Sequence, residues 1–387
     1  MVATVRRGAS QRSVAKRFGV TLNTVQRWVS HAEGQRLDRV DWSGARGGRR
    51  DGQATAVDVE DLILSLRKVL RETSDLGEFG AAAIHRELTA RKKTLALKRV
   101  PSLRTIGRIL ERRGALDGQR RVRRPPPPKG WYLPDVGARQ CELDSVDIVE
   151  GLVIQGGLQV EVLNVISLHG GLCESWINDT ATAKFAVEKL ISHWKTHGLP
   201  KYAQFDNDTI FQGAHQWPDS FGRVIRLCLQ LKVIPVFAPP RETGFQAMIE
   251  AYNGRWQEKV WKRFVHTSHA SLQARSDRFT AAARLRAAPR IEAAPRRRPF
   301  PKSWELNLKK PLKGQVVFIR RTNASGEVEL LCHTYLVSPQ WCNRLVRCVV
   351  DLTQGKISFY RLRRRAPTEQ PLIKTLVYKV PTKRFQE

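Results

Sequence analysis

The sequence predicts a multidomain protein with all-α modules at its N-terminus, a central α/β core with a mixed five-stranded sheet, and a small β-barrel at its C-terminus. Residues 1–118 show helical periodicity with well-placed capping residues. Residues 135–268 alternate between apolar strand segments and amphipathic helix segments, which is typical of an α/β domain. Residues 311–387 contain short β-type runs separated by turn sequences, as expected of a small barrel.

The composition indicates the class of partner. The formal net charge is +31 and the isoelectric point is near 10.7. Because the excess charge lies in blocks of arginine, we expect a polyanion, and in particular nucleic acid, as the partner. A ribosome-like or merely basic surface is the alternative. A hydrophobic content of 41% with ten tryptophans is enough to build real cores, so a chain that is disordered throughout is excluded.

Other sequence features exclude several further classes. No apolar run is long enough to span a membrane, and the N-terminus lacks the apolar segment of a signal peptide. Six cysteines show no CxxC pair, and the nine histidines do not cluster with cysteines or acids at metal-site spacing. We therefore expect an intracellular protein with reduced cysteines and without a zinc site.

Residues 1–40 are predicted to form a helix-turn-helix DNA-binding domain. The segment 11–32 contains two helices, with Gly19 in the turn and Thr21 as the N-cap of the second helix. The residues expected to form its small core are Val14, Phe18, Val20, Val25 and Trp28. The residues expected to face outward on the second helix are Leu22, Asn23, Gln26 and Arg27. The three polar ones are our candidates for reading base edges in the major groove.

Residues 53–118 are predicted to form a second helix-turn-helix or winged-helix module. Pro101 and Ser102 precede a helix over 103–113 whose apolar residues point inward. The candidate DNA contacts on its outer face are Arg104, Arg108 and Arg112. The alternative is a plain three-helix spacer with a solvated basic face.

Two basic linkers are predicted to flank the core. Residues 119–134 contain four consecutive prolines, Pro125–Pro128, which form a semi-rigid polyproline spacer. Residues 269–310 are rich in alanine, arginine and proline, and we expect them to be extended. The arginines of this second linker that we expect to contact DNA phosphates are Arg296, Arg297 and Arg298.

Three acidic residues of the core stand in predicted secondary structure that is otherwise apolar. Asp144 lies within the strand 139–148, Asp206 ends the strand 201–206, and Glu250 lies on the helix that starts near residue 245. Clustered carboxylates are costly unless a cation neutralises them, and hard oxygen ligands favour Mg²⁺ or Mn²⁺. Pairing of these acids with the many arginines is the alternative. Asp147 lies on the opposite strand face from Asp144, so only one of them can be a ligand, and we choose Asp144.

The core resembles the DDE-type transposases of bacterial insertion sequences, whose catalytic core is shared with retroviral integrases. The resemblance covers about residues 135–266 and rests on Glu142-Leu-Asp144, on Phe205-Asp-Asn-Asp208 and on the segment Pro239–Asn253. It implies an RNase H-like fold and two Mg²⁺ (or Mn²⁺) ions per active site. It also implies that the catalytic and metal-binding residues are Asp144, Asp206 and Glu250.

The resemblance also implies partners and a location. The implied partners are double-stranded DNA (transposon terminal repeats and target DNA), a second copy of the chain on paired ends, and accessory transposition proteins. The implied location is the bacterial cytoplasm, in association with the nucleoid.

The sequence departs from the family pattern at three points. Asp208 stands where glycine is frequent, the interval between Asp206 and Glu250 is longer than usual, and Gln257 replaces a basic residue common in integrase-like cores. The residues of this helical region that we expect to contact DNA instead are Asn253, Arg255 and Lys259.

The sequence therefore predicts a DNA transposase or integrase that hydrolyses phosphodiesters and transfers strands at transposon ends. A non-catalytic, domesticated DNA-binding regulator or targeting protein of transposase origin is the alternative. A structure-selective nuclease with the same fold is a third possibility.

Overall fold

A computed structural model describes residues 1–42, 55–116, 129–214, 216–242, 244–364 and 366–379. The chain separates into two compact units, residues 1–64 and residues 65–387. The four prolines predicted to act as a spacer lie outside the described residues, as does most of the Gly/Arg-rich stretch after residue 42. No helix among the described residues is both long and apolar enough to cross a membrane.

The first unit begins with three short helices, α1 (Val2–Arg6), α2 (Gln11–Phe18) and α3 (Leu22–His31). The hydroxyl of Thr21 accepts a hydrogen bond from the backbone N–H of Thr24 and caps α3. Gly19 ends α2 with φ of 63°, a left-handed conformation that favours glycine. Val14 and Val25 are buried, but Phe18 is 47% exposed, so its predicted place in the core is wrong.

Three further helices follow, α4 (Val57–Thr73), α5 (Ala81–Ala90) and α6 (Leu103–Arg112). Ser102 caps α6, and the buried face of this helix consists of Ile106, Ile109 and Leu110. No strand lies among residues 55–116, so the wing of a winged-helix module is not observed there.

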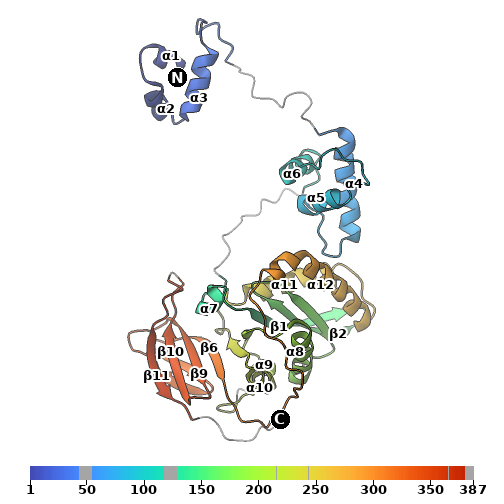
Figure 1. The fold of residues 1–387 in the computed structure, drawn as a ribbon, viewed down its shortest axis with the longest axis vertical. Coiled ribbons are helices and arrows are strands. Elements are labelled where there is room, and N and C mark those ends of the chain that lie inside the picture. The colour runs from blue at the N-terminus through green and yellow to red at the C-terminus, as the bar shows by residue number, and fades with distance from the viewer. Residues whose placement is uncertain (43–54, 117–128, 215, 243, 365, 380–387) are drawn as a thin grey trace. The chain divides into compact units, whose positions relative to one another are not determined.

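The mixed α/β core predicted from the sequence is confirmed (Figure 1). Its first three strands form an antiparallel meander of β1 (Leu143–Ile154), β2 (Leu158–Ser167) and β3 (Cys173–Asn178). Two strands then run parallel to β1, namely β4 (Tyr202–Phe205) and β5 (Ile234–Phe237). These are the five strands predicted for the core, but the mixed sheet continues beyond them, so the predicted strand number of five is wrong.

Helices cover both faces of this sheet. Two of them, α8 (Ala183–His197) and α10 (Arg223–Gln230), pack on the face that carries Leu163 and Val165 of β2. On the other face, α11 (Ala247–Trp256) and α12 (His269–Glu292) pack against Val162 and neighbouring apolar residues. Short elements complete the core: α7 (Pro134–Gly137), α9 (Thr209–Gln212) and the π-helical turn η1 (Gln257–Trp261).

The C-terminal strands extend this same sheet, so the separate β-barrel predicted for residues 311–387 is not observed among the described residues. Strand β6 (Gln315–Arg321) pairs in parallel with β5. It is followed in the sheet by β9 (Leu345–Asp351), β10 (Lys356–Arg361) and β11 (Leu372–Val377), all antiparallel. A separate hairpin is formed by β7 (Glu327–Leu330) and β8 (His333–Leu336).

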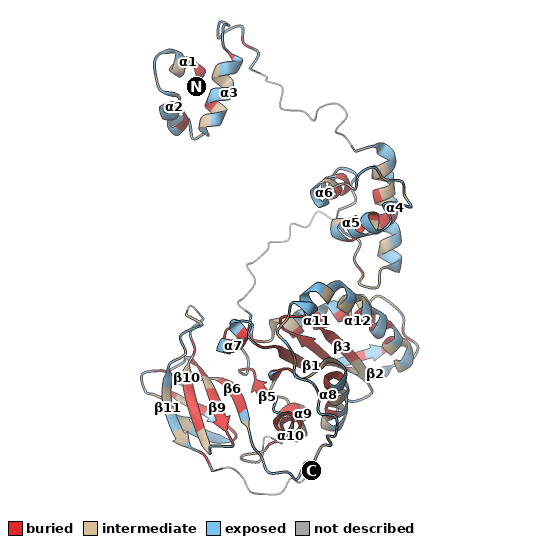
Figure 2. Ribbon diagram, in the orientation of Figure 1, coloured by how far each residue is buried: buried red, intermediate tan, exposed pale blue. Residues whose placement is uncertain are grey.

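The sheet therefore has nine strands in the order β11-β10-β9-β6-β5-β4-β1-β2-β3. One hydrophobic cluster runs from β1 and β2 through β5 to β6, β9 and β10. Figure 2 shows buried residues along these strands in both halves of the sheet. Short β-type runs in a sequence do not reveal whether they form a sheet of their own or pair with a strand of a preceding domain. For this reason the sequence predicts a separate C-terminal domain.

The segment 269–310 is also different from the extended linker that we expected. It begins with the 24-residue helix α12, whose start is fixed by a capping box between Ser268 and Ser271. Alanine and arginine are both good helix formers, so the composition of this stretch favours a helix once Ser268 starts it. Pro289 lies within the last turns of α12 without ending it at once.

Candidate functional site

The parallel register of β1 and β4 brings Asp147 to the level of Asp206. Asp144 is paired with Ala203 and Ser145 with Gln204. Asp147 is two residues beyond Ser145, and Asp206 is two residues beyond Gln204, so Asp147 within β1 lies level with Asp206, which directly follows β4. Asp144 lies three residues further back and on the opposite strand face.

The electrostatics of Asp147 identify its neighbours. Burial raises the pKa of this carboxyl group from an ordinary 3.8 to about 7, and the negative charges of Asp206 and Glu250 contribute in the same direction. The amide of Asn253 donates a hydrogen bond of 2.7 Å to Oδ2 of Asp147, and Asn164 in turn donates one of 2.8 Å to Asn253. The structure thus places Asp147 within electrostatic range of the carboxylates of Asp206 and Glu250.

The segment that carries Asp206 is held on both sides. Oδ1 of Asp206 accepts a hydrogen bond from the backbone N–H of Asp208, and Asp208 caps the short helix α9. Arg320 of β6 donates to Oδ1 of Asn207 at 2.8 Å and to the carbonyl oxygen of Ala238 at 3.3 Å. Burial lowers the pKa of Arg320 to about 10. Strand β6 therefore supports the segment after Asp206 directly.

Glu250 comes from a different element. It lies in the first turn of α11 and its side chain is exposed, while Ile249 and Tyr252 on the same helix are buried. The apolar side of α11 thus holds the helix against the sheet while Glu250 remains accessible. Asn253, which lies one turn after Glu250 on α11, is directed at Asp147.

Asp144 has a structural environment, and this contradicts its choice as the first metal ligand. It is completely buried, its Oδ1 is engaged by Arg297, and its Oδ2 accepts from Arg297 and from the indole of Trp194 at 3.1 Å each. Although burial alone would raise the pKa of Asp144, the adjacent Arg297 guanidinium holds it well below its ordinary value. Pairing with arginine, the alternative weighed for the acids, holds for this one.

The predicted base-reading residues are accessible. Asn23, Gln26 and Arg27 are all exposed on α3, the second helix of the helix-turn-helix pair. A second exposed basic row lies on α6, opposite its buried face, and consists of Arg104, Arg108 and Arg112. Each helix therefore presents a polar or basic face suited to a groove of duplex DNA.

The other predicted DNA contacts divide into exposed and structural residues. Arg255 is exposed and Lys259 is half-buried, so both are partly accessible on and just after α11. Asn253 is only 8% exposed and holds Asp147, which contradicts a role in DNA contact. Arg297 is bound to Asp144, and Arg298 donates to the carbonyl oxygens of Leu231 and Lys232.

Among the three arginines at 296–298 that were predicted to bind phosphate, Arg296 alone is exposed and has no hydrogen bond or ion pair to another described residue. A run of like charges is usually solvated, which is why the sequence alone predicts that all three arginines contact DNA. The sequence does not show that the buried Asp144 forms an ion pair with Arg297.

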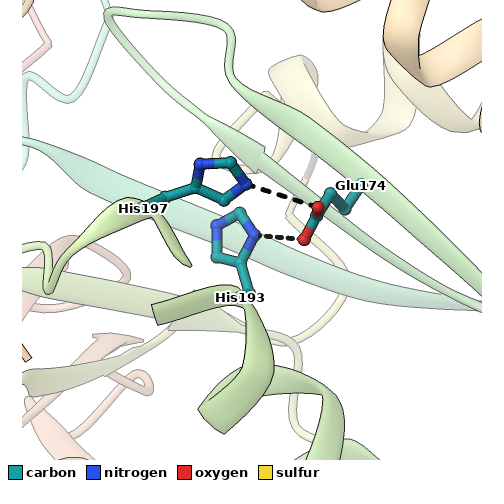
Figure 3. Close-up of side chains that lie close together, drawn as sticks. All are labelled: Glu174, His193 and His197. Carbon is teal, nitrogen blue, oxygen red and sulfur yellow. Dashed lines mark hydrogen bonds and ion pairs between the residues drawn. The ribbon is translucent and has the colours of Figure 1, made fainter. Parts of the chain in front are cut away.

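One cluster was missed altogether. Glu174 on β3 lies beside His193 and His197 on α8, with ligand-type atoms within 4.8 Å of one another (Figure 3). The available signal was the His-x-x-x-His spacing, which places two imidazoles on one helical face. The expectation that no histidines cluster with acids is therefore wrong.

Comparisons with known proteins return structural likeness only. No family model matches the chain, and no curated protein matches it. The catalytic core domain of BIV integrase is 15% identical, with a TM-score of 0.26 over 34% of this chain and 79% of that one. A chain of the simian T-cell lymphotropic virus intasome in complex with PP2A regulatory subunit B56 gamma is 12% identical, with a TM-score of 0.32 over 72% of this chain and 92% of that one.

The HTLV-2 integrase catalytic core domain, solved in complex with magnesium, is 9% identical, with a TM-score of 0.26 over 36% of this chain and 82% of that one. No activity follows for this chain from likeness at these identities and TM-scores.

Proposed function

We propose that this chain is a DNA transposase or integrase whose active site consists of Asp147, Asp206 and Glu250. One observation carries the proposal: Asp147 within β1 lies beside Asp206 at the end of the adjacent strand β4, and burial together with the charges of Asp206 and Glu250 raises the pKa of Asp147. Asp147 replaces Asp144 as the first acid because Asp144 is bound to Arg297.

The donor set fits divalent cations. The charges of Asp206 and Glu250 add to the effect of burial in raising the pKa of Asp147, and a cation bound beside these carboxylates would relieve their repulsion. Oxygen ligands of this kind suit Mg²⁺ or Mn²⁺, and we propose two ions per site. Such ions activate a water molecule or a DNA 3′-hydroxyl for in-line attack on a phosphodiester and stabilise the leaving oxygen.

The protein's own groups fix the geometry for this chemistry. Asn253 orients Asp147 through a bond that is itself braced by Asn164. Arg320 braces the loop after Asp206 through Asn207. Such supporting hydrogen bonds matter because phosphoryl transfer depends chiefly on positioning and on electrostatic stabilisation.

The exposed faces of α3 and α6 support a sequence-specific DNA substrate. We propose that they bind transposon terminal repeats, with the net positive charge attracting target DNA. Cleavage and joining of two paired transposon ends require at least a second copy of the chain. We propose accessory transposition proteins as further partners. A nuclease without preferred ends would not need two helical modules.

The test is strand transfer by the full chain on fluorescent duplexes that carry the repeats flanking its gene, with Mg²⁺ or Mn²⁺. We expect end nicking and joining by the wild type, loss of both in Asp147→Asn and Asp206→Asn, and unchanged repeat binding. Asp277→Asn, an acid on α12 outside the site, is the matched control and should remain active. Repeat binding without cleavage in either metal would favour the regulator, and an active Asp147→Asn variant would refute the assignment of that residue.

A further inference from the structure

A second cluster of ligand-type side chains lies away from the three catalytic acids. Glu174 comes from β3, which is the edge strand of the sheet, and His193 and His197 come from successive turns of α8. Figure 3 shows both imidazoles directed at the carboxylate of Glu174. Glu174 pairs in register with Val165, whose side chain belongs to the α8 face, whereas Asp147 pairs with Asn164, which faces α11.

The distances suit a small ion. Nδ1 of His193 is 2.7 Å from Oε2 of Glu174, and Nε2 of His197 is 3.3 Å from Oε1. Ligands around a tetrahedral Zn²⁺, with bonds of about 2.0–2.1 Å, are about 3.3 Å apart. An ion can therefore be bound between these atoms after small side-chain shifts.

An independent observation concerns the other ring nitrogen of His193. The ring is completely buried, and its Nε2 makes no hydrogen bond among the described residues but lies 3.7 Å from Oδ2 of Asp144. A histidine that binds a metal through one nitrogen usually presents the other to a carboxylate, which fixes its tautomer. Asp144, which is held by Arg297 and Trp194, is the carboxylate in this position beside His193.

The remaining surroundings are compatible with a fourth ligand. The side chains of Glu174 and His197 are 20% and 19% exposed, so water can reach the cluster from one side. Arg284 of α12 donates to Oε1 of Glu174 at 2.8 Å, and a carboxylate can accept this bond while its other lone pairs bind an ion. Two imidazoles in the set favour zinc over magnesium.

We propose that Glu174, His193 and His197 bind one Zn²⁺ ion, with water as the fourth ligand. The ion joins the edge strand β3 to α8, and through His193 and Asp144 it steadies the segment that contains Arg297. This site is separate from the catalytic carboxylates, and its existence does not depend on the proposed activity.

The test uses the full chain, stripped with a chelator and then titrated with Zn²⁺ alone. Isothermal titration and metal analysis after desalting should give one bound zinc per chain. His197→Gln and Glu174→Gln should each weaken binding at least tenfold, whereas His197→Cys, which restores a ligand, should retain it. Co²⁺ in the wild type should give the intense visible absorption of a tetrahedral site. Circular dichroism verifies that each variant is folded.

Two controls separate this site from other metal binding. His31→Gln removes an exposed imidazole on α3, and Asp206→Asn removes a catalytic acid, so both should bind zinc like the wild type. Absence of stoichiometric zinc in the wild type would mean that the cluster is a hydrogen-bonded network only. Equal affinity in folded His197→Gln, or loss of the zinc in Asp206→Asn, would likewise overturn the proposal.

Discussion

Two aspartates three residues apart on β1 should respond in opposite ways to the same substitution. Asp147→Asn removes a carboxylate that the folded protein disfavours, and the new amide oxygen can still accept the bond from Asn253. Asp144→Asn removes a carboxylate that neutralises Arg297 in the interior. We therefore expect the first variant to be more stable than the wild type, and the second less stable, in the absence of divalent cations.

The magnitude for Asp147 follows from its pKa. Because the folded-state pKa is about 7 against an ordinary 3.8, folding favours the protonated acid, and stability present below pH 4 is lost as the pH rises through 7. At about 1.4 kcal/mol per pKa unit, the advantage of asparagine grows from about 1 kcal/mol near pH 4.5 to about 4 kcal/mol near pH 8.

The ionised carboxylate of Asp144 has the opposite effect on the stability of the fold. Its pKa is lowered in the folded state, so its contribution is present at neutral pH and is lost only as the pH falls below the ordinary value. Breaking a buried ion pair by removal of one partner costs about 3–5 kcal/mol. Asp144→Asn should therefore be destabilised by that order near pH 8.

The assay is thermal unfolding followed by circular dichroism in chelator, from pH 4.5 to pH 8. At pH 8, Asp147→Asn should melt roughly 5–10 °C above the wild type, and this difference should shrink towards pH 4.5. Addition of Mg²⁺ should stabilise the wild type more than the variant. A lower melting temperature for Asp147→Asn at pH 8, or a difference independent of pH, would refute the placement of Asp147 beside Asp206.

Further predictions concern DNA contact, support of the site and domain limits. Arg27→Ala should lose about 1–3 kcal/mol of binding to the terminal repeat and little on random duplex, and equal losses on both in titrations at fixed salt would remove α3 as the reading helix. Arg320→Met should lower the strand-transfer rate about tenfold at unchanged repeat affinity, since it frees Asn207, and an unchanged rate would show that this support is dispensable. A fragment of residues 135–268 should aggregate or unfold in circular dichroism and gel filtration, whereas residues 129–379 should fold. A folded shorter fragment would contradict the shared core.

The sequence predicted the core elements well because their signals are local. Apolar runs, the cap at Thr21 and the periodicity of α6 depend on neighbours a few residues away. The acids Asp206 and Glu250 could be selected because each interrupts or ends an apolar segment. That selection required no knowledge of which strands are neighbours.

The errors at the candidate sites involve partners distant in the chain. Choosing between Asp144 and Asp147 required the position of Arg297, which is 153 residues from Asp144 in sequence. Strand alternation showed that the two acids face opposite ways but did not show which face held the arginine. The Glu174 cluster was missed for the same reason, because the spacing of His193 and His197 becomes meaningful only when β3 is placed beside α8.

The parallel pairing of β5 with β6 has a consequence for synthesis of the chain on the ribosome. Arg320, which braces Asn207, follows it by 113 residues, and β6 itself needs β9 on its other side. Contacts of such long sequence separation form late, because the intervening chain must first be present. A nascent chain that has emerged only as far as α11 therefore contains all three proposed catalytic acids but lacks the strand that braces the segment after Asp206. We expect the polypeptide to acquire its cutting geometry only after its last third has been translated.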